Sequence, residues 1–445
     1  MTGSHPRLAR TATLLAATLA SATCTPARRT PSTPPSVETC CLADGLRIAE
    51  RYRVDAIGAR RFTHDELWRA VAPSLSTGAL RSEEIGRSIL GRDIRAITFG
   101  TGATRVLLWS QMHGDESTAT MALADILRFL SEAKDDPMRE RLVRALTIVF
   151  VPMLNPDGAE LFQRENAAGV DVNRDARRLS TPEARALKGL RDRLRPDFGF
   201  NLHDQNARTR AGRTGEQAAI ALLAPPASED RRYDAVRTRA RLVAATIART
   251  LAPEIAGRIA KYDDSFNPRA FGDLMQQWGT STVLIESGAL PDDPQKQRLR
   301  ALNVAAILSA LDAIATGGYA AADPDAYEQL PYNAGGASDL LVLGGQLVLP
   351  GAPPMLVDVA VNYDDAVAGT GPRVRDVGDL RDGVAIDTVD ASGLFLHPGG
   401  AALTTRAGGA GRWLRLGSPA ALDIRRGADP GSEIVRRIGG AGGER

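Results

Sequence analysis

Cysteine is nearly absent from this sequence of 445 residues, with only Cys24, Cys40 and Cys41 present. All three lie before residue 45, so the rest of the chain has no pair for a disulfide and no thiol nucleophile. An excess of one charge is also lacking, because the formal net charge is +2. That balance gives no reason to expect nucleic acid or acidic partners. With 43% hydrophobic and 24% charged residues, the composition is typical of a soluble globular protein.

Beyond the N-terminus, the sequence suggests no segment long and apolar enough to cross a membrane, so we expect no transmembrane segment. The N-terminus itself has the pattern of an export signal. Arg7 and Arg10 precede a short apolar run at 11–20, and small residues follow up to Ala22. We therefore expect cleavage near Ala22 and a periplasmic or secreted protein. Lipid attachment at Cys24 is the less favoured alternative.

The residue pattern changes along the chain, which predicts a division into four parts. Apolar strands alternate with amphipathic helices through the middle of the chain, a pattern typical of an α/β domain with a mostly parallel mixed central sheet flanked by helices. Short β-like runs rich in Gly, Pro and Asp follow, and they predict a small all-β, sandwich-like domain. The predicted parts are a signal peptide (1–22), a Pro/Thr/Ser-rich linker (23–45), the α/β domain (46–320) and the β domain (325–445).

Two histidines directly follow predicted buried strands, at the strand ends where α/β sheets carry ligand sites. His113 and Glu116 form an H-x-x-E motif after the strand expected at 105–110. His203 follows the strand expected at 198–202 in the same way. Two histidines and one glutamate make a three-ligand set with an open fourth position, which is typical of catalytic zinc.

Further polar motifs surround these residues along the chain. They are Ser88-x-x-Gly91-Arg92, Asn155-Pro156-Asp157-Gly158, Gly169-Val170-Asp171-Val172-Asn173-Arg174 and Ile285-Glu286-Ser287-Gly288. In this order and at these intervals they resemble the zinc carboxypeptidases of the carboxypeptidase A type, over residues 46–316. The resemblance implies a carboxypeptidase-like fold, a bound Zn²⁺ ion and a metallocarboxypeptidase that hydrolyses C-terminal peptide bonds.

The resemblance also implies how the metal centre works. His113, Glu116 and His203 match the zinc ligands. Asp171 matches a carboxylate that orients the first zinc-binding histidine, a role with clear physical sense. Glu286 matches the general base, and an ionisable residue at the end of an apolar strand needs such a use or a partner.

A second group of matches concerns the substrate, a peptide or peptide-like molecule with a free C-terminal carboxylate. Asn173 and Arg174 match the pair that grips this carboxylate, for which the planar fork of arginine is suited. Arg164 lies near the position of an arginine that polarises the scissile carbonyl. Arg92 matches a residue lining the outer substrate cleft, and Tyr262 matches a mobile tyrosine that closes over substrate.

Other functions remain open at this point. A zinc amidase acting on peptidoglycan stem peptides or N-acyl amino acids would share the metal site. A non-catalytic binding module would be expected to have lost a ligand or the base, and both are present. Segments 339–345, 357–361 and 388–399 resemble the small β domain of amidohydrolases without its metal-binding barrel, so we expect an appendage in which His397 is structural.

Overall fold

The computed structural model describes residues 41–213, 216–405 and 412–439. The predicted export signal, Cys24 and Cys40 lie outside this part of the chain. Residues 39–445 form one compact unit by their internal contacts. The boundary expected between residues 320 and 325 remains a prediction.

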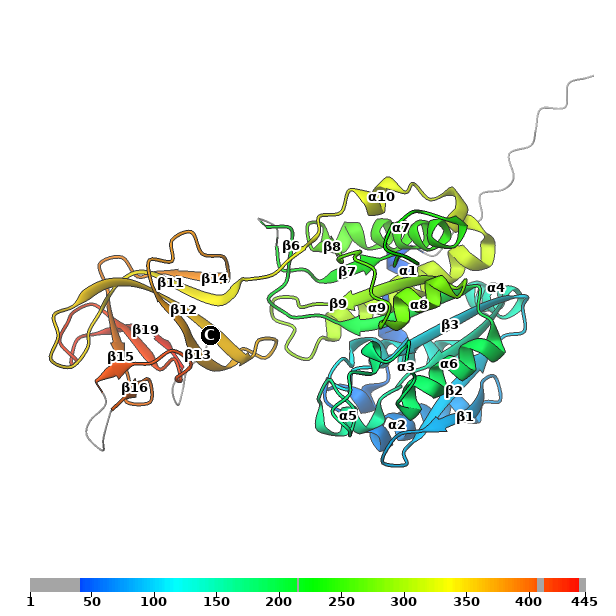
Figure 1. Ribbon diagram of the computed structural model, residues 1–445, viewed down its shortest axis with the longest axis horizontal. Helices are drawn as coiled ribbons and strands as arrows, with labels where there is room; N and C mark the ends of the chain where they lie inside the picture. Colours follow the sequence, from blue (N-terminus) through cyan, green and yellow to red (C-terminus); the bar gives the residue numbers. More distant parts are fainter. Residues whose placement is uncertain (1–40, 214–215, 406–411, 440–445) are drawn as a thin grey trace, which may run out of the picture. The chain divides into compact units, whose positions relative to one another are not determined.

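An eight-stranded mixed sheet forms the centre of the α/β part, in the order β1-β2-β4-β3-β5-β9-β7-β8 (Figure 1). The central strands β4, β3, β5 and β9 are parallel to one another, whereas β1, β2 and β7 join antiparallel neighbours. The expected mixed sheet flanked by helices is thus confirmed. The strands are β1 (Arg81–Arg87), β2 (Asp93–Phe99), β3 (Thr104–Ser110), β4 (Leu146–Val151), β5 (Phe198–Asp204), β7 (Ile220–Leu223), β8 (Ile259–Lys261) and β9 (Ser281–Ser287).

Helices cover both faces of this sheet because alternate side chains of each central strand point to opposite sides. In β3, Val106 and Leu108 join a core cluster with helices α1, α2, α3, α7 and α9. Leu107 and Trp109 join a second cluster with α6 and α8. The helices are α1 (Leu42–Arg51), α2 (His64–Ser76), α3 (Thr118–Glu132), α4 (Pro137–Ala145), α5 (Pro156–Leu161), α6 (Pro182–Leu194), α7 (Ala235–Ile255), α8 (Phe271–Gln277), α9 (Gln297–Thr316) and α10 (Asp325–Glu328).

Two helices depart from the sequence expectations. Helix α1 begins at Leu42, within the stretch 23–45 expected to be linker, and its Gly45 packs directly on Ala305 of α9. Helix α9 is long and apolar enough to cross a membrane, with a mean hydropathy of 1.5, so the expectation that no such segment exists is wrong on that criterion. Because 83% of its apolar window is buried within the protein, α9 is better explained as a core helix.

The C-terminal part is built on one seven-stranded sheet with its own hydrophobic cluster. Strand β11 lies at its centre, antiparallel to β12 and parallel to β14 and β15. Nε2 of His397 lies 3.0 Å from the carbonyl oxygen of Gly427. The strands are β11 (Ser338–Leu347), β12 (Met355–Asp365), β13 (Thr370–Gly378), β14 (Ala385–Asp390), β15 (Phe395–Pro398), β18 (Leu422–Arg425) and β19 (Ile434–Ile438).

Candidate active site

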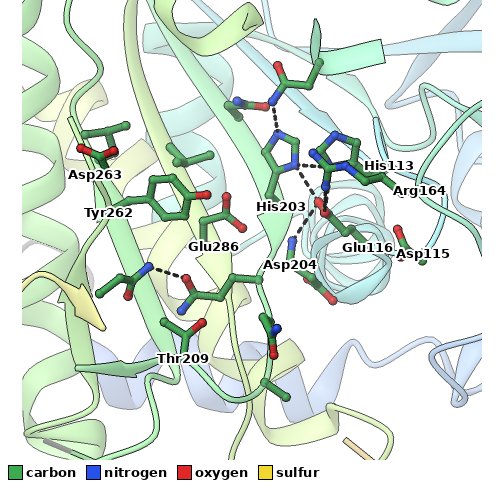
Figure 2. Close-up of a pocket in the computed structure, with 18 of the residues that line it drawn as sticks. His113, Asp115, Glu116, Arg164, His203, Asp204, Thr209, Tyr262, Asp263 and Glu286 are labelled. Atoms are coloured by element: carbon green, nitrogen blue, oxygen red, sulfur yellow. Dashed lines mark hydrogen bonds and ion pairs between the residues drawn. The ribbon is translucent and has the colours of Figure 1, made fainter. Parts of the chain in front are cut away.

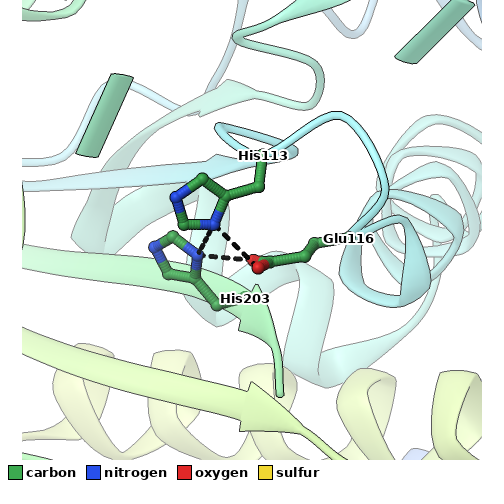
Figure 3. Close-up of side chains that lie close together, drawn as sticks. All are labelled: His113, Glu116 and His203. Atoms are coloured by element: carbon green, nitrogen blue, oxygen red, sulfur yellow. Dashed lines mark hydrogen bonds and ion pairs between the residues drawn. The ribbon is translucent and has the colours of Figure 1, made fainter. Parts of the chain in front are cut away.

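The three expected metal ligands come together at the carboxyl ends of β3 and β5. His113 lies in the turn after β3, Glu116 precedes α3, and His203 is the penultimate residue of β5. Their ligand atoms all lie within 4.8 Å of one another (Figure 3). All three side chains are buried, with at most 7% of each residue exposed. Parallel strands bring their carboxyl ends to one edge, which is why residues 90 positions apart can converge.

The chemistry of this cluster fits a divalent cation. Nδ1 of His113 lies 2.7 Å from Glu116 Oε1, and Nδ1 of His203 lies 2.6 Å from Glu116 Oε2. The two Nδ1 atoms face each other at 3.1 Å. Two imidazole lone pairs at this distance repel unless a proton or a metal ion lies between them. Nitrogen and carboxylate oxygen ligands in this number suit zinc and leave room for a fourth ligand.

The ionisation of the cluster follows from its burial and its charges. Burial favours neutral imidazole, but Glu116 and Asp171 overcome it and raise the pKa of His113 to about 9. Burial lowers the pKa of His203. Burial alone would raise the pKa of Glu116, yet the two histidines hold it below its usual range. A cation that binds here therefore displaces the proton of His113.

Asp171 orients the ring of His113 through a contact with its Nε2. Its side chain caps the short 3₁₀ turn Val172–Arg174 by accepting the backbone N–H of Asn173 at 2.8 Å. The same oxygen lies 3.0 Å from His113 Nε2. Although burial opposes it, this contact and Arg164 keep the pKa of Asp171 below its usual range. Asp171 therefore accepts the Nε2 proton and leaves Nδ1 directed at Glu116.

Arg164 lies closer to the cluster than the sequence suggested. It binds Asp171 Oδ2 through Nε and Nη2, and its Nη1 lies 3.0 Å from His113 Nδ1 and 3.1 Å from Glu116 Oε1. In this structure its guanidinium adds positive charge beside Glu116. A metal ion on the same ligand atoms would compete with Nη1 for them.

Glu286 lies beside the cluster on the neighbouring strand. It is the register partner of His203 across the parallel pair β5 and β9. Within the described part of the chain no hydrogen bond to its carboxylate is found, and only 8% of the residue is exposed. Burial, reinforced by the negative charge of Glu116, raises the pKa of Glu286 well above its usual value. A buried carboxyl group without a permanent partner is suited to proton transfer.

Tyr262 faces this carboxyl group. Figure 2 shows its hydroxyl directed toward Glu286, with the cluster of His113, Glu116 and His203 on the other side of Glu286. The negative charge of Glu286, together with burial, raises the pKa of Tyr262 to about 12. Its hydroxyl thus stays protonated and can donate a hydrogen bond into the site.

Asn173 and Arg174 follow Asp171 and line the same cavity. The side-chain oxygen of Asn173 accepts the backbone N–H of Phe271 at 2.9 Å, and its Nδ2 lies 3.4 Å from His203 Nε2. Arg174 donates through Nη1 to the carbonyl oxygen of Asn173 at 2.9 Å. Asn173 is therefore partly engaged by the protein, while Arg174 keeps most of its fork for a ligand.

Arg92, like Asp171, is an expected site residue that does not line this cavity. Its Nη1 donates to Asp157 Oδ1 at 2.8 Å, and its Nε lies 3.6 Å from Glu160 Oε1. These contacts tie Arg92 to the start of helix α5 instead.

Several groups around the cavity, which has a volume of about 1250 Å³, had no role assigned to them from the sequence. Asp204, next to His203, binds Lys296 at 2.9 Å and Thr118 at 2.6 Å through Oδ2, and its backbone N–H donates to Glu116 at 3.1 Å. Its position directly after a predicted ligand was the available signal. Lys296 carried no such signal in the sequence, because it lies in the loop before α9, where its own backbone has a positive φ of 54°.

Known proteins resemble the part of the chain that holds this site. Residues 73–214 match the family model described as zinc carboxypeptidase. A probable carboxypeptidase 2 of Arthroderma benhamiae is 32% identical over 103 residues, which are 23% of this chain and 19% of the fungal protein. Carboxypeptidase M of Mus musculus is 27% identical over 135 residues, covering 26% of this chain and 30% of the mouse protein. The chain thus matches only a minor part of these relatives' length.

Among solved structures, a metallo-carboxypeptidase from Burkholderia cenocepacia is similar, with 20% identity and a TM-score of 0.46. The alignment covers 57% of this chain and 70% of that one. His113, Glu116, Asp171, Asn173, Arg174 and His203 all fall within the segment that the family model matches. The resemblance expected from the sequence is therefore confirmed, because residues 73–214 match the family model of the zinc carboxypeptidases.

Proposed function

We propose that this protein is a zinc-dependent metallocarboxypeptidase that hydrolyses the C-terminal peptide bond of peptides. The observation that carries the proposal is the position of Glu286. Its buried carboxyl group lies in register with His203, beside three converging ligand atoms and in one cavity with Arg174. A nucleophile-activating base, a metal centre and a carboxylate anchor are thus within reach of one bound peptide.

His113, Glu116 and His203 would hold the zinc ion. Bound zinc supplies a water activated near neutral pH and a Lewis acid for the scissile carbonyl. Asp171 keeps His113 in the tautomer that directs Nδ1 to the metal, as its hydrogen bond to Nε2 indicates.

Glu286 would move the proton. Its carboxylate accepts a proton as water attacks the carbonyl carbon, and then delivers it to the nitrogen of the leaving amine. The lack of a permanent hydrogen-bond partner favours this role, because the carboxylate need not give up a protein contact at each step. Tyr262, whose hydroxyl faces Glu286, donates a hydrogen bond to the substrate beside it.

Arg174 and Asn173 would hold the terminal carboxylate of the substrate. Arg174 binds it through its planar fork, and Asn173 adds a bond from Nδ2. Arg164 would donate to the carbonyl oxygen as negative charge develops there. For that role its Nη1 must leave His113 and Glu116, which a cation at the cluster would promote.

The decisive experiment is the substitution Glu286→Gln in zinc-loaded protein. We expect hydrolysis of a C-terminal residue to fall by about 10²- to 10⁴-fold, the usual contribution of a general base. Bound zinc, measured by atomic absorption, should remain equal to that of the wild type. Substantial hydrolysis by the variant would overturn the assignment of Glu286.

A digest of a peptide library, read by mass spectrometry with and without a chelator, defines the substrate class. Loss of single C-terminal residues that stops with the chelator is expected. Cleavage of peptidoglycan stem peptides or N-acyl amino acids in preference to plain peptides would instead identify a zinc amidase.

We further propose export, on the pattern of residues 1–22, which N-terminal sequencing of the mature protein would test.

A further inference from the structure

Part of the cavity wall comes from the chain beyond α10, although the metal ligands and Glu286 all come from the α/β part. The contributing residues are Tyr332, Asn333, Gly335 and the segment 364–367. The latter belongs to the tip of the hairpin formed by β12 and β13, here called the hairpin tip (residues 364–370). Two separate segments of the C-terminal part thus reach the candidate active site.

The first segment is strand β10 (Asn333–Ala334), which pairs antiparallel with β6 (Arg210–Ala211). The side chain of Asn333 donates to Gln205 Oε1 at 2.6 Å, and Gln205 lies two residues after the ligand His203. Within the described residues, Gln205 Nε2 and Asn333 Oδ1 have no hydrogen-bond partner, and both atoms are shielded from solvent. A donor and an acceptor are therefore left unpaired together on this wall, and a bound peptide backbone could pair with them once these side chains turn toward the cavity.

The second segment, the hairpin tip, is tied to the rim of the site by ion pairs. Asp365 binds the guanidinium of Arg60, and Arg61 lies 3.5 Å from the same oxygen. The Arg60 side chain is only 11% exposed and that of Asp365 only 21%. Asp365 also accepts the backbone N–H of Ala368 at 3.0 Å, which shapes the tip. Because water is largely excluded, this pair fixes the tip more firmly than a surface ion pair would.

A further contact holds the same hairpin next to its tip. Arg208 donates to Asp339 Oδ2 at 2.9 Å and to the carbonyl oxygen of Tyr363 at 2.6 Å. Asp339 in turn accepts the backbone N–H of Tyr363 at 2.6 Å. Arg208 lies in the loop after β5 and lines the cavity. The hairpin is thus held at its tip and at Tyr363 beside the tip, by two parts of the cavity rim.

The size of the cavity shows why these walls matter. Its volume of about 1250 Å³ exceeds the roughly 300–1,000 Å³ of pockets for drug-sized ligands. A single C-terminal residue held at Arg174 would leave much of this space unfilled. Each further residue of an extended peptide adds about 3.3–3.6 Å of length. A peptide whose terminus lies at Arg174 therefore extends toward the other walls of the cavity.

We propose that the hairpin tip and strand β10 form the outer substrate cleft, where they bind peptide residues on the N-terminal side of the scissile bond. This inference rests on the proposed function and adds to it a preference for extended peptides of about four residues or more over N-acylated dipeptides. Asn333 and Gln205 offer hydrogen bonds to the peptide backbone, and the hairpin tip closes the side of the cleft. The C-terminal part is then a specificity element of the enzyme.

The test compares a hexapeptide with an N-acylated dipeptide that has the same last two residues, using the full-length, zinc-loaded protein. The variants are Asp365→Arg, Arg60→Asp and the two combined. We expect each single variant to lower the ratio of kcat/KM for hexapeptide over dipeptide by about fivefold or more, comparable to the loss of one hydrogen bond. The double variant, which restores an ion pair in reverse, should recover the ratio to within about twofold.

A matched control is Arg381→Ala, which removes an exposed ion pair with Asp379 elsewhere in the C-terminal part. Its ratio should equal that of the wild type. Asp365→Asn serves as a milder variant if charge reversal impairs folding. An unchanged ratio in the folded single variants would overturn the proposal and leave the hairpin with a structural role only.

A second readout separates this inference from the proposed function. Hydrogen exchange of residues 364–370 should slow when the hexapeptide binds the Glu286→Gln variant, and should change less with the dipeptide. Wild-type protein that hydrolyses neither substrate would contradict the proposed function. Hydrolysis of both with equal ratios in all variants and no protection of the hairpin tip would contradict the cleft alone.

Discussion

Nε2 of His113 lies 3.0 Å from Oδ1 of Asp171, and this same oxygen accepts the backbone N–H of Asn173 at 2.8 Å. One carboxylate therefore fixes both the orientation of a metal-ligand candidate and the start of the turn that carries Arg174. The proposed metal centre and the proposed carboxylate anchor are thus coupled through Asp171. Changes at this residue should affect zinc affinity as well as substrate binding.

Asp171→Asn should weaken zinc binding without removing a ligand. The amide can still accept a hydrogen bond, but it carries no charge to stabilise His113, so we expect zinc affinity to fall by about 10- to 100-fold. Competition with a chromophoric chelator measures this change. The control Asp192→Asn alters an exposed carboxylate that pairs with Lys188 and should leave the affinity unaltered. Equal affinity in both variants would show that Asp171 does not support His113.

Arg174→Ala should harm substrates with a free C-terminus selectively. Loss of a charge-assisted bond predicts that kcat/KM falls by about 10- to 100-fold for a free carboxylate. A C-terminally amidated analogue cannot form that bond, so its hydrolysis should change much less. Arg174→Lys keeps the charge without the fork and should recover only part of the loss. An equal loss on both substrates would argue against carboxylate anchoring.

The metal-type cluster was accessible to sequence reasoning because it depends on local patterns. His113 and His203 each follow a buried strand, and neighbouring parallel strands end at the same edge of the sheet. The pairing of β5 with β9 then places Glu286 beside His203. The H-x-x-E spacing and the strand ends indicated only a possible metal site, and the resemblance to the zinc carboxypeptidases was needed to predict the full set. The three ligand atoms do converge.

Contacts between distant segments were not accessible in the same way. Arg60 and Asp365 are separated by 305 positions, and neither lies in a periodic pattern that names its partner. Arg92 was matched by its motif alone, yet its ion pair with Asp157 holds it away from the cavity. Strand β1, with a mostly exposed pattern, showed no apolar alternation and was missed. Sequence patterns thus revealed buried periodic elements but not side-chain pairing across loops.

Arg300→Met should destabilise the α/β part strongly. Arg300 of α9 binds both oxygens of Asp125 in α3, at 2.7 and 2.5 Å, and also donates to the carbonyl oxygens of Val54 and Ile57. Removing it leaves Asp125 buried and unpaired, which predicts a loss of about 3–5 kcal/mol in the free energy of unfolding. Chemical denaturation of metal-free protein measures this loss.

The control Arg298→Met lies on the same helix. Its side chain is 59% exposed, and its ion pair with Glu254 is long, at 3.8 Å. The expected change in the free energy of unfolding is therefore within about 0.5 kcal/mol. A loss at Arg300 no larger than this would show that the buried pair contributes little to holding α9 on α3.

Asp273→Asn should change how stability depends on pH. Burial raises the pKa of the Asp273 carboxyl to about 6, from 3.8 for an exposed aspartate. The folded protein then holds this proton more tightly than the unfolded chain does, so the contribution of Asp273 is fully favourable below about pH 4 and is lost as pH rises through about 6. At pH 8 the ionised group disfavours folding by about 1–3 kcal/mol, since each pKa unit corresponds to about 1.4 kcal/mol.

Asparagine at this position cannot ionise and still accepts the backbone N–H of Asn267, which Asp273 binds at 2.8 Å. The difference in unfolding free energy between Asp273→Asn and the wild type should therefore rise by about 1–3 kcal/mol from pH 4 to pH 8. Urea denaturation of metal-free protein at several pH values measures it without a contribution from metal binding. Asp135→Asn, which changes an exposed carboxylate, is the control for the loss of a surface charge. A pH-independent difference for Asp273→Asn would mean that its carboxyl titrates alike in the folded and unfolded states.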